Sequence, residues 1–542
     1  FALQSTARVT RLSWILVKLG PMNIFKTIAG FALVCALWGA HGSSFAEETA
    51  SGWYQSGAQA IAERRARLEA GEAKNIVLFV GDGMSMATIT AARILAGQRA
   101  GKPGESHRLA FEHFPHTALA KTYNTNQQTP DSAGTMTALS TGVKTFAGAI
   151  AVDQQAERGN CASIRGRELV SLLDLAKSGG LRAGIVTTAR ITHATPAVLF
   201  AKSPERGWES DQGFPAEARA SGCRDIARQL VDYDLGGGID VVFGGGRSGF
   251  LPVSASDPEY PDIRGRRQDA TDLLELWRER NEKGHFAWNR ETFDELPAAV
   301  TGNVLGLFEP SHMRYEHDRS DDPAGEPSLA EMTVKALNVL ESRSRDGYVL
   351  VVEGARIDHA HHAGNAYRAL VDTIAFSDAI SATVARVDAE DTLVVVTADH
   401  GHALAFGGYA SRGNPILGLV RGPGASGEAP RLARDENDKP YTTLSYYNGP
   451  GYRAGERPDY DEIDPEHPDF RQEATVAMRS ATHSGEDVPV YALGPGAEVL
   501  SGSVEQHLIF HAMLQAQPKL ARQADAIAGE DGLPDWSQLK VE

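Results

Sequence analysis

The sequence predicts an α/β protein: a mostly parallel central sheet flanked by helices on both faces, with an inserted subdomain at about residues 404–480. Three observations lead to this fold class. Short, continuous apolar runs recur along the chain, as expected of strands that are buried on both faces. Helical patterns separate these runs, which is typical of parallel sheets. Several runs end in an acidic residue, and ligands of such sheets bind beyond the carboxyl ends of the strands.

The first 46 residues have the pattern of a leader. We take Met22 as the translation start, because Lys26 then supplies a positive region, residues 28–38 an apolar stretch, and residues 44–46 a small-x-small cleavage site. We therefore predict a signal peptide within residues 1–46, a mature domain from about 47 to 542, and a secreted or periplasmic location. An uncleaved anchor is the alternative. No later run approaches the roughly 20 apolar residues of a spanning helix, so we expect no stable membrane association.

Cysteine usage fits an oxidising compartment. Of three cysteines, Cys35 lies in the apolar stretch of the leader, which leaves Cys161 and Cys223. We expect these two to form a disulfide. Two buried free thiols are the alternative.

The charge of the chain excludes some partners. Its formal net charge is -17, and the charged residues of the leader are all basic, so the mature chain is more acidic still. Such a surface repels nucleic acid, which we exclude as a structural partner. An anionic substrate would need a site that carries its own positive charge, and bound metal ions supply one.

The elements follow in order along the chain. A helix is expected within residues 47–70, and later helices at 171–177 and 366–387. The strand-like runs lie at 75–80, 183–188, 239–243, 348–352 and 392–398. Residues 404–480 are rich in Gly, Pro, Tyr, Arg and Asp, so we expect a mostly irregular or short-stranded insertion there. The main fold resumes at Val488.

Acids follow three of the predicted strands. Asp82, Glu353 and Asp399 stand at these ends, and Asp358 and His362 come soon after the second of them. Because Asp358 and His362 are four residues apart, they lie on one face of a helix. A carboxylate and an imidazole placed in this way can hold a catalytic zinc with a position left open. A solvated His-rich helix start and ordinary N-caps are the alternatives, but three such acids favour one converging metal site.

Ser132 opens a run of small residues that predicts a helix. The N-terminus of a helix favours an oxyanion, although a serine there is more commonly a plain N-cap. No Gly-x-Ser-x-Gly surrounds Ser132, so a hydrolase triad is not indicated. We expect a metal ion to activate this hydroxyl.

Five stretches are specific when taken together: GDGMS at 81–85, PDSAGTMTALSTGVKT at 130–145, VEGARIDHAHH at 352–362, TADHGHA at 397–403 and THSGEDVPVYA at 482–492. They resemble the alkaline phosphatase family, and the likeness extends from about Trp53 to the end. The chain is similar to a secreted bacterial member of the animal type. The resemblance implies hydrolysis of phosphate monoesters through a phosphoserine, and a homodimer whose contacts include the family's crown at 404–480. An alkaline optimum is expected because zinc lowers the pKa of a water bound to it.

The resemblance also implies two Zn2+ and one Mg2+ per subunit. Ser132 would be the nucleophile, and Arg206 would clamp two phosphate oxygens; a surface arginine is the alternative for Arg206. The first zinc would take Asp358, His362 and His483; the second Asp82, Ser132, Asp399 and His400; the magnesium Asp82, Thr195 and Glu353, with His193 just outside its ligands. His359 and His402 match positions that do not bind metal directly.

The resemblance implies a calcium site and supports the disulfide expected above. Glu259, the Phe308 carbonyl, Glu309 and Glu326 resemble the structural calcium site of animal-type members, and oxygen ligands from loops suit Ca2+. The family typically has Asp at position 326, and a two-residue insertion precedes it here. Cys161 and Cys223 also match a family disulfide.

Three other functions are the alternatives to phosphate monoester hydrolysis. A sulfatase would need C/S-x-P-x-R around its nucleophile, which the sequence after Ser132 lacks. A phosphodiesterase of the same superfamily generally lacks the third-metal residues, which are Asp82, Thr195 and Glu353 here. A periplasmic metal-binding protein is the alternative from another class. The physiological substrate is not encoded in any of these motifs.

Overall fold

The computed structural model describes residues 48–297, 299–425 and 428–539. The predicted signal peptide, with Met22 and Cys35, lies outside this part of the chain. Among the residues that are described, no helix combines the length and apolarity needed to cross a membrane.

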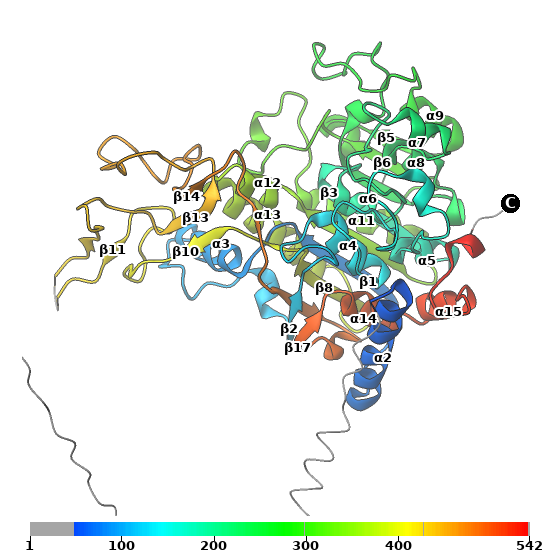
Figure 1. Cartoon of the computed structure of the whole chain (residues 1–542), viewed down its shortest axis with the longest axis horizontal. Coiled ribbons are helices and arrows are strands. Elements are labelled where there is room, and N and C mark those ends of the chain that lie inside the picture. The colour runs from blue at the N-terminus through cyan, green and yellow to red at the C-terminus, as the bar shows by residue number, and fades with distance from the viewer. Residues whose placement is uncertain (1–47, 298, 426–427, 540–542) are drawn as a thin grey trace, which may run out of the picture. The chain divides into compact units, whose positions relative to one another are not determined.

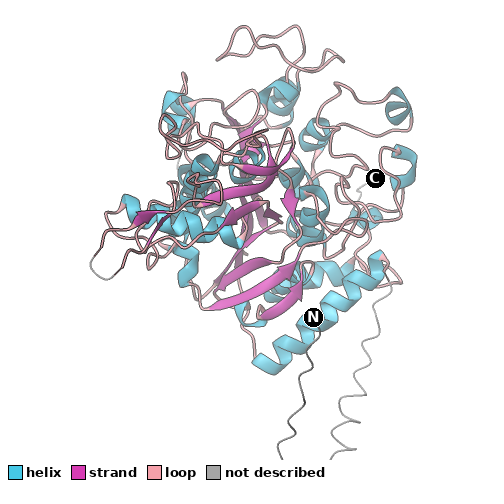
Figure 2. Cartoon of the chain, turned by 60° about the vertical axis from the view of Figure 1, so that its left-hand side comes forward, coloured by secondary structure: helices cyan, strands magenta, loops and turns pink. Residues whose placement is uncertain are grey.

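A ten-stranded sheet forms the centre of the fold (Figures 1 and 2). Its strands are β1 (Asn75–Gly81), β2 (His116–Lys121), β3 (Arg182–Arg190), β4 (Val241–Gly245), β5 (His285–Ala287), β6 (Val304–Leu307), β7 (Tyr348–Gly354), β8 (Thr392–Ala398), β16 (Val488–Leu493) and β17 (Gly502–Glu505). They are ordered β17-β2-β16-β8-β1-β7-β3-β4-β6-β5. β16 is antiparallel to β2 and β8, and the other neighbouring pairs are parallel. The predicted mostly parallel sheet is confirmed.

Helices flank this sheet on both faces (Figure 2). They are α2 (Ala50–Leu68), α3 (Met86–Arg99), α4 (Ser132–Thr141), α5 (Leu172–Ser178), α6 (Ala194–Ala197), α7 (Ala216–Ala220), α8 (Ile226–Asp232), α9 (Leu273–Arg280), α10 (Arg290–Asp294), α11 (Leu329–Arg343), α12 (Arg356–His362), α13 (Ala366–Val384), α14 (Leu508–Ala516) and α15 (Pro518–Ala526). One group packs around α13 with α3, α11 and α12, and another around α14 with α2, α4 and α15. The helix expected within residues 47–70 is α2.

The three central strands β8, β1 and β7 are buried at every residue. Their apolar, largely β-branched composition suits a strand covered on both faces. In the parallel register, Gly81 at the end of β1 lies beside Gly354 of β7 and Ala398 of β8. The polar residues at and beyond these strand ends therefore meet at one edge of the sheet.

Residues 404–480, here called the inserted segment, contribute no strand to the ten-stranded sheet among the residues described. β10 (Leu404–Phe406), β13 (Leu444–Gly449) and β14 (Ala474–Ala477) form a small sheet, and β11 (Arg421–Gly422) pairs with β12 (Arg431–Leu432). Figure 1 shows this segment in yellow to orange beside the central sheet. At its base, β9 (Gly401–His402) pairs with β15 (His483–Ser484).

A disulfide joins Cys161 and Cys223, as predicted. Trp208 and Phe214 pack with this disulfide in a small apolar cluster. This cluster at the disulfide is separate from the main core, to which other residues of the same loop belong.

Candidate active site

Four carboxylates from distant parts of the chain meet at the carboxyl edge of the sheet. Asp82 follows β1, Glu353 belongs to the end of β7, Asp399 follows β8, and Asp358 lies on α12. Their exposed fractions lie between 0% and 3%. Gly83 permits this approach, because it has φ +67 and a Cβ there would lie 3.1 Å from Asp358 Oδ1.

The electrostatics of this cluster require compensating positive charge. Burial and then neighbouring carboxylates raise the pKa of Asp82 well above its usual value. Burial raises the pKa of Asp399 to about 6 and that of Glu353 to about 8, although the hydroxyls of Thr187 and Thr195 lower the latter. Both carboxylate oxygens of Asp82 and Asp358 Oδ1 are buried without a hydrogen-bond partner in the described part of the chain. Ionised carboxylates in such surroundings are stable when they bind cations.

Three histidines at the site share one protonation pattern. In each of them Nδ1 faces a backbone carbonyl. His362 Nδ1 lies 2.6 Å from the carbonyl oxygen of Ala481, His483 Nδ1 2.8 Å from that of Pro130, and His400 Nδ1 3.1 Å from that of Gly401. Since a carbonyl oxygen only accepts, each Nδ1 must carry a proton. When the ring is neutral, each Nε2 then presents a lone pair, the arrangement of metal-binding histidines. Burial lowers the pKa of His400 and of His483 to about 4, so both rings are neutral at neutral pH.

The first group of potential ligand atoms lies around Asp358. Its oxygens lie 3.3 Å from His362 Nε2 and 3.4 Å from His483 Nε2, and these two nitrogens are 3.2 Å apart. His402 belongs to the same group by distance. Its protonation differs, because its Nδ1 accepts the Ala403 N–H and its Nε2 proton therefore faces Asp358 Oδ1 at 3.4 Å. A protonated Nε2 offers no lone pair to a metal ion, so we do not expect His402 to be a ligand.

The second group surrounds His400 Nε2. Ser132 Oγ lies 3.1 Å away, Asp399 Oδ2 3.2 Å and Asp82 Oδ1 3.4 Å. These four residues are the predicted ligands of the second zinc. An unprotonated nitrogen that faces two carboxylates is stabilised when a cation lies between them.

The third group lies between β1, β3 and β7. Asp82, Glu353 and His193 have potential ligand atoms within 4.8 Å of one another. Thr195 at the start of α6 is 1% exposed, and its Oγ1 has no hydrogen-bond partner within the described ranges. The donors here are mainly oxygens, which suits Mg2+.

Ser132 is the first residue of α4. Asp131 caps this helix by accepting the Gly134 N–H at 3.1 Å, and it also accepts from Arg206 Nη1 at 3.0 Å. Arg206 Nη2 lies 3.2 Å from His193 Nε2. The Arg206 side chain is 23% exposed, so it is half-buried beside Asp131 and His193. Burial alone would raise the pKa of Asp131, but Arg206 and the backbone N–H groups of Gly134 and Gly148 together outweigh burial, and the pKa is lowered.

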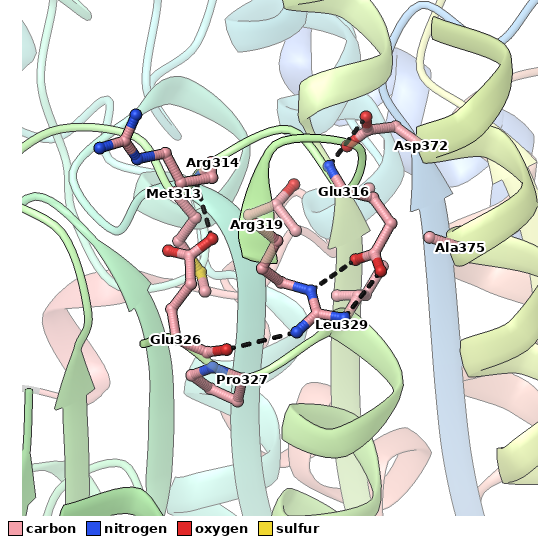
Figure 3. A pocket seen from close by; sticks show the side chains of 11 residues that line it. Met313, Arg314, Glu316, Arg319, Glu326, Pro327, Leu329, Asp372 and Ala375 are labelled. Carbon is pink, nitrogen blue, oxygen red and sulfur yellow. Dashed lines mark hydrogen bonds and ion pairs between the residues drawn. The ribbon is translucent and has the colours of Figure 1, made fainter. Parts of the chain in front are cut away.

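A fourth group of acids lies apart from these three. Glu259 and Glu309 have carboxylate oxygens within 4.8 Å of one another and of Asp322, which the sequence analysis did not single out. Burial raises the pKa of Glu309 to about 7. Phe308 directly precedes Glu309. Glu326 lies outside this group: Figure 3 shows its carboxylate turned to the Arg314 backbone N–H, with which it makes a 2.9 Å hydrogen bond.

The family of the chain follows from its similarity to known proteins. The family model described as alkaline phosphatase matches residues 73–518. The chain belongs to the alkaline phosphatase family. Its reaction is accordingly the hydrolysis of phosphate monoesters, and no observation favours a diesterase or a storage protein.

Relatives in this family cover most of the chain. The tissue-nonspecific alkaline phosphatase of Homo sapiens is 44% identical over 458 residues, which are 83% of this chain and 84% of that protein. The alkaline phosphatase of Gadus morhua is 42% identical over 456 residues, 83% of this chain and 92% of that protein.

Solved structures of alkaline phosphatases share the fold. The enzyme from Thermus thermophilus has a TM-score of 0.58 and 26% identity, covering 83% of this chain and 92% of its own. The enzyme from the Antarctic bacterium TAB5 has a TM-score of 0.56 and 22% identity, covering 83% of this chain and 99% of its own, and this likeness concerns the fold alone.

Proposed function

We propose that this alkaline phosphatase transfers the phosphoryl group to Ser132 in a site that holds two Zn2+ and one Mg2+. The observation that carries the proposal is the convergence of Ser132 Oγ, Asp82 Oδ1 and Asp399 Oδ2 on His400 Nε2, at 3.1–3.4 Å. Residues from three distant sequence segments supply these atoms.

The donor sets of the three groups fit different ions. Asp358, His362 and His483 would hold one zinc, and Asp82, Ser132, Asp399 and His400 the other. Asp82, Thr195 and Glu353 would hold magnesium, with His193 outside its ligands. The support is that Asp82 Oδ1 and Oδ2, Thr195 Oγ1, Glu353 Oε1 and Asp358 Oδ1 are buried without hydrogen bonds to described residues. When bound, these ions would neutralise phosphate charge and lower the pKa of the serine hydroxyl and of a bound water, which gives an alkaline optimum.

The chain's own residues then carry out two displacements. Ser132 Oγ attacks phosphorus and loses its proton, a bond from Oγ to phosphorus forms, and the ester oxygen leaves with its electron pair and takes up one proton. Water then attacks the phosphoserine and loses a proton, the bond from Oγ to phosphorus breaks, Oγ takes up a proton, and inorganic phosphate leaves. Ser132 is 2% exposed and is the first residue of α4, where the helix dipole favours a negatively charged oxygen.

Arg206 would bind two oxygens of the phosphate group. Its guanidinium is held by Asp131, which directly precedes the nucleophile, so its position relative to Ser132 is set by one carboxylate. A planar guanidinium provides the paired N–H donors that such a contact needs.

We also propose a structural Ca2+ site, a secreted or periplasmic location and a homodimer. Glu259, Glu309, Glu326 and the Phe308 carbonyl are the candidate calcium ligands, and we add Asp322 to them. The support is that Asp322 Oδ2 and Glu326 Oε2 are buried without a hydrogen-bond partner among the residues described. The location and dimer rest on the leader pattern and on the family resemblance.

Substitution of the nucleophile tests the proposal. Ser132→Ala should lower kcat by at least about a thousandfold and abolish a phosphorylated protein trapped with labelled monoester, while zinc remains bound. Ser140→Ala is the matched control, because Ser140 is a buried serine on the same helix. Wild-type turnover by Ser132→Ala would show that another group attacks phosphorus.

A further inference from the structure

A chain of buried hydrogen bonds runs from the inserted segment to α12 and on to α3. Tyr446 Oη lies 2.7 Å from His361 Nδ1, and His361 Nε2 lies 2.9 Å from Thr88 Oγ1. Thr88 Oγ1 is 2.9 Å from Ser85 Oγ, the N-cap of α3. All four side chains are at most 1% exposed. These groups have no part in the chemistry described above.

The direction of the protons follows from burial. If the His361 ring donated to Tyr446, the phenolic hydrogen would be buried without an acceptor among the residues described, at a cost of roughly 1–3 kcal/mol. Tyr446 therefore donates to Nδ1, and His361 Nε2–H donates to Thr88 Oγ1. Both ring nitrogens are occupied, so His361 does not bind metal although it adjoins His362.

His361 lies between two proposed zinc ligands on a short helix. α12 has seven residues, and Ala355, which precedes it, provides no side-chain cap. A helix of this length is held in place by its tertiary contacts and not by its own hydrogen bonds. The rotation of α12 decides where Asp358 and His362 point, and His361 ties that rotation to Tyr446 and Thr88.

The strand that carries Tyr446 also contacts the segment that carries His483. Asn448, two residues along β13, accepts the Thr482 N–H at 2.8 Å and donates to Thr482 Oγ1 at 2.9 Å. Residues two apart on a strand face the same side. β13 therefore contacts both backbone segments that present the first zinc group, α12 through Tyr446 and residues 482–483 through Asn448.

We propose that β13 of the inserted segment braces the first zinc group, with Tyr446 as a positioning residue that acts through His361. This inference rests on the proposed ligands Asp358, His362 and His483. It makes retention of one zinc depend on a hydroxyl in a segment that supplies no ligand itself.

Zinc release from the purified, metal-loaded protein tests the inference. Tyr446→Phe removes only the hydroxyl. It should speed the loss of one zinc per chain to a chromogenic chelator by about tenfold, because removing groups that orient metal ligands commonly weakens metal binding by this amount. The other zinc and the magnesium should be retained as in the wild type. When cobalt replaces zinc in the first group, the visible absorption spectrum of Tyr446→Phe should differ from that of the wild type. This readout does not depend on turnover.

Tyr460→Phe is the matched control. Tyr460 is a buried tyrosine of the same inserted segment, and its hydroxyl donates to Glu473 at 2.7 Å and not to His361. This variant should release zinc at the wild-type rate. Thr88→Val removes the hydrogen bond at the other side of His361 and leaves the inserted segment unchanged, so it should also speed zinc release. It provides a second test if Tyr446→Phe folds poorly.

The outcomes separate this inference from the proposed function. Wild-type zinc release by both Tyr446→Phe and Thr88→Val, with zinc lost from His362→Ala, would overturn the brace and leave the ligand set intact. Full metal content in His362→Ala would overturn the ligand set and the brace with it.

Discussion

Asp131 holds the start of α4 and Arg206 together. Its carboxylate accepts the Gly134 and Gly148 backbone N–H groups and the Arg206 guanidinium. Asp131→Ala should lower the free energy of unfolding by about 1–2 kcal/mol, because the helix loses its N-cap. Asp131→Asn keeps a capping oxygen and should be affected less in urea unfolding. Equal losses in the two variants would show that the cap is not what Asp131 provides.

Arg206 is expected to act on phosphate and not on the metals. Arg206→Ala should reduce kcat/KM for a monoester by about a hundredfold and weaken inhibition by inorganic phosphate, because paired donors to the phosphate oxygens are lost. Arg206→Lys, which keeps the charge but not the planar fork, should recover only part of this. Unchanged phosphate inhibition in Arg206→Ala, with normal metal content, would contradict the assigned role.

Asp372 on α13 is a buried acid that accepts the Glu316 N–H and is not among the proposed metal ligands (Figure 3). Burial raises its pKa to about 8, so the folded protein binds a proton there that the unfolded chain, with a pKa near 3.8, releases. Stability from this group is therefore lost as pH rises from about 4 to 8. Asp372→Asn keeps an acceptor for the Glu316 N–H, and its stability relative to wild type should increase over that window.

Thermal unfolding of both proteins at roughly pH 5 and pH 9 measures this difference. The gain for Asp372→Asn at the higher pH should be on the order of 1 kcal/mol or more, since one pKa unit corresponds to about 1.4 kcal/mol. A gain that does not change with pH would show that Asp372 is ionised in the folded protein throughout.

Among the elements, the disulfide loop carries Arg206. The cysteines are 62 residues apart, and in the chain-entropy model closing such a loop stabilises the fold by about 4 kcal/mol. The Cys161→Ser/Cys223→Ser double variant should unfold at lower urea concentration and show a raised KM, with kcat changed less. A lower midpoint with an unaltered KM would separate loop stability from the position of Arg206.

The sequence predicted the central strands better than the outer ones. The runs at 75–80, 348–352 and 392–398 lie in β1, β7 and β8, because continuous apolar residues mark strands buried on both faces. β2 was missed because its residues alternate between exposed and buried, with too few apolar side chains to stand out. The run at 239–243 begins two residues before β4, whose glycines 244 and 245 still pair with neighbouring strands. The order of the strands depends on pairing between distant segments, which no local pattern contains.

In the molecule as a whole, residues near strand ends were predictable, and residues that act through contacts were not. The acids and histidines of the site follow recognisable strands, so their convergence could be inferred from parallel topology. Asp322 and Tyr446 carry no local signal, since each gains its role from a partner far away in the sequence. The contact of Asp131 with Arg206 also joins distant positions, although its capping of α4 is local. The protonation of His402 likewise depends on a backbone contact that the sequence does not reveal.

The central claim is that separate strand ends form one pocket in which several metal ions and a single serine hydroxyl hydrolyse phosphate esters. Elemental analysis of the purified chain, alongside monoester turnover before and after chelation, tests it most directly. Two zinc ions and one magnesium ion per chain are expected, with turnover abolished by chelation and restored when both metals return. Full turnover by a chain from which all metal has been removed would contradict the account.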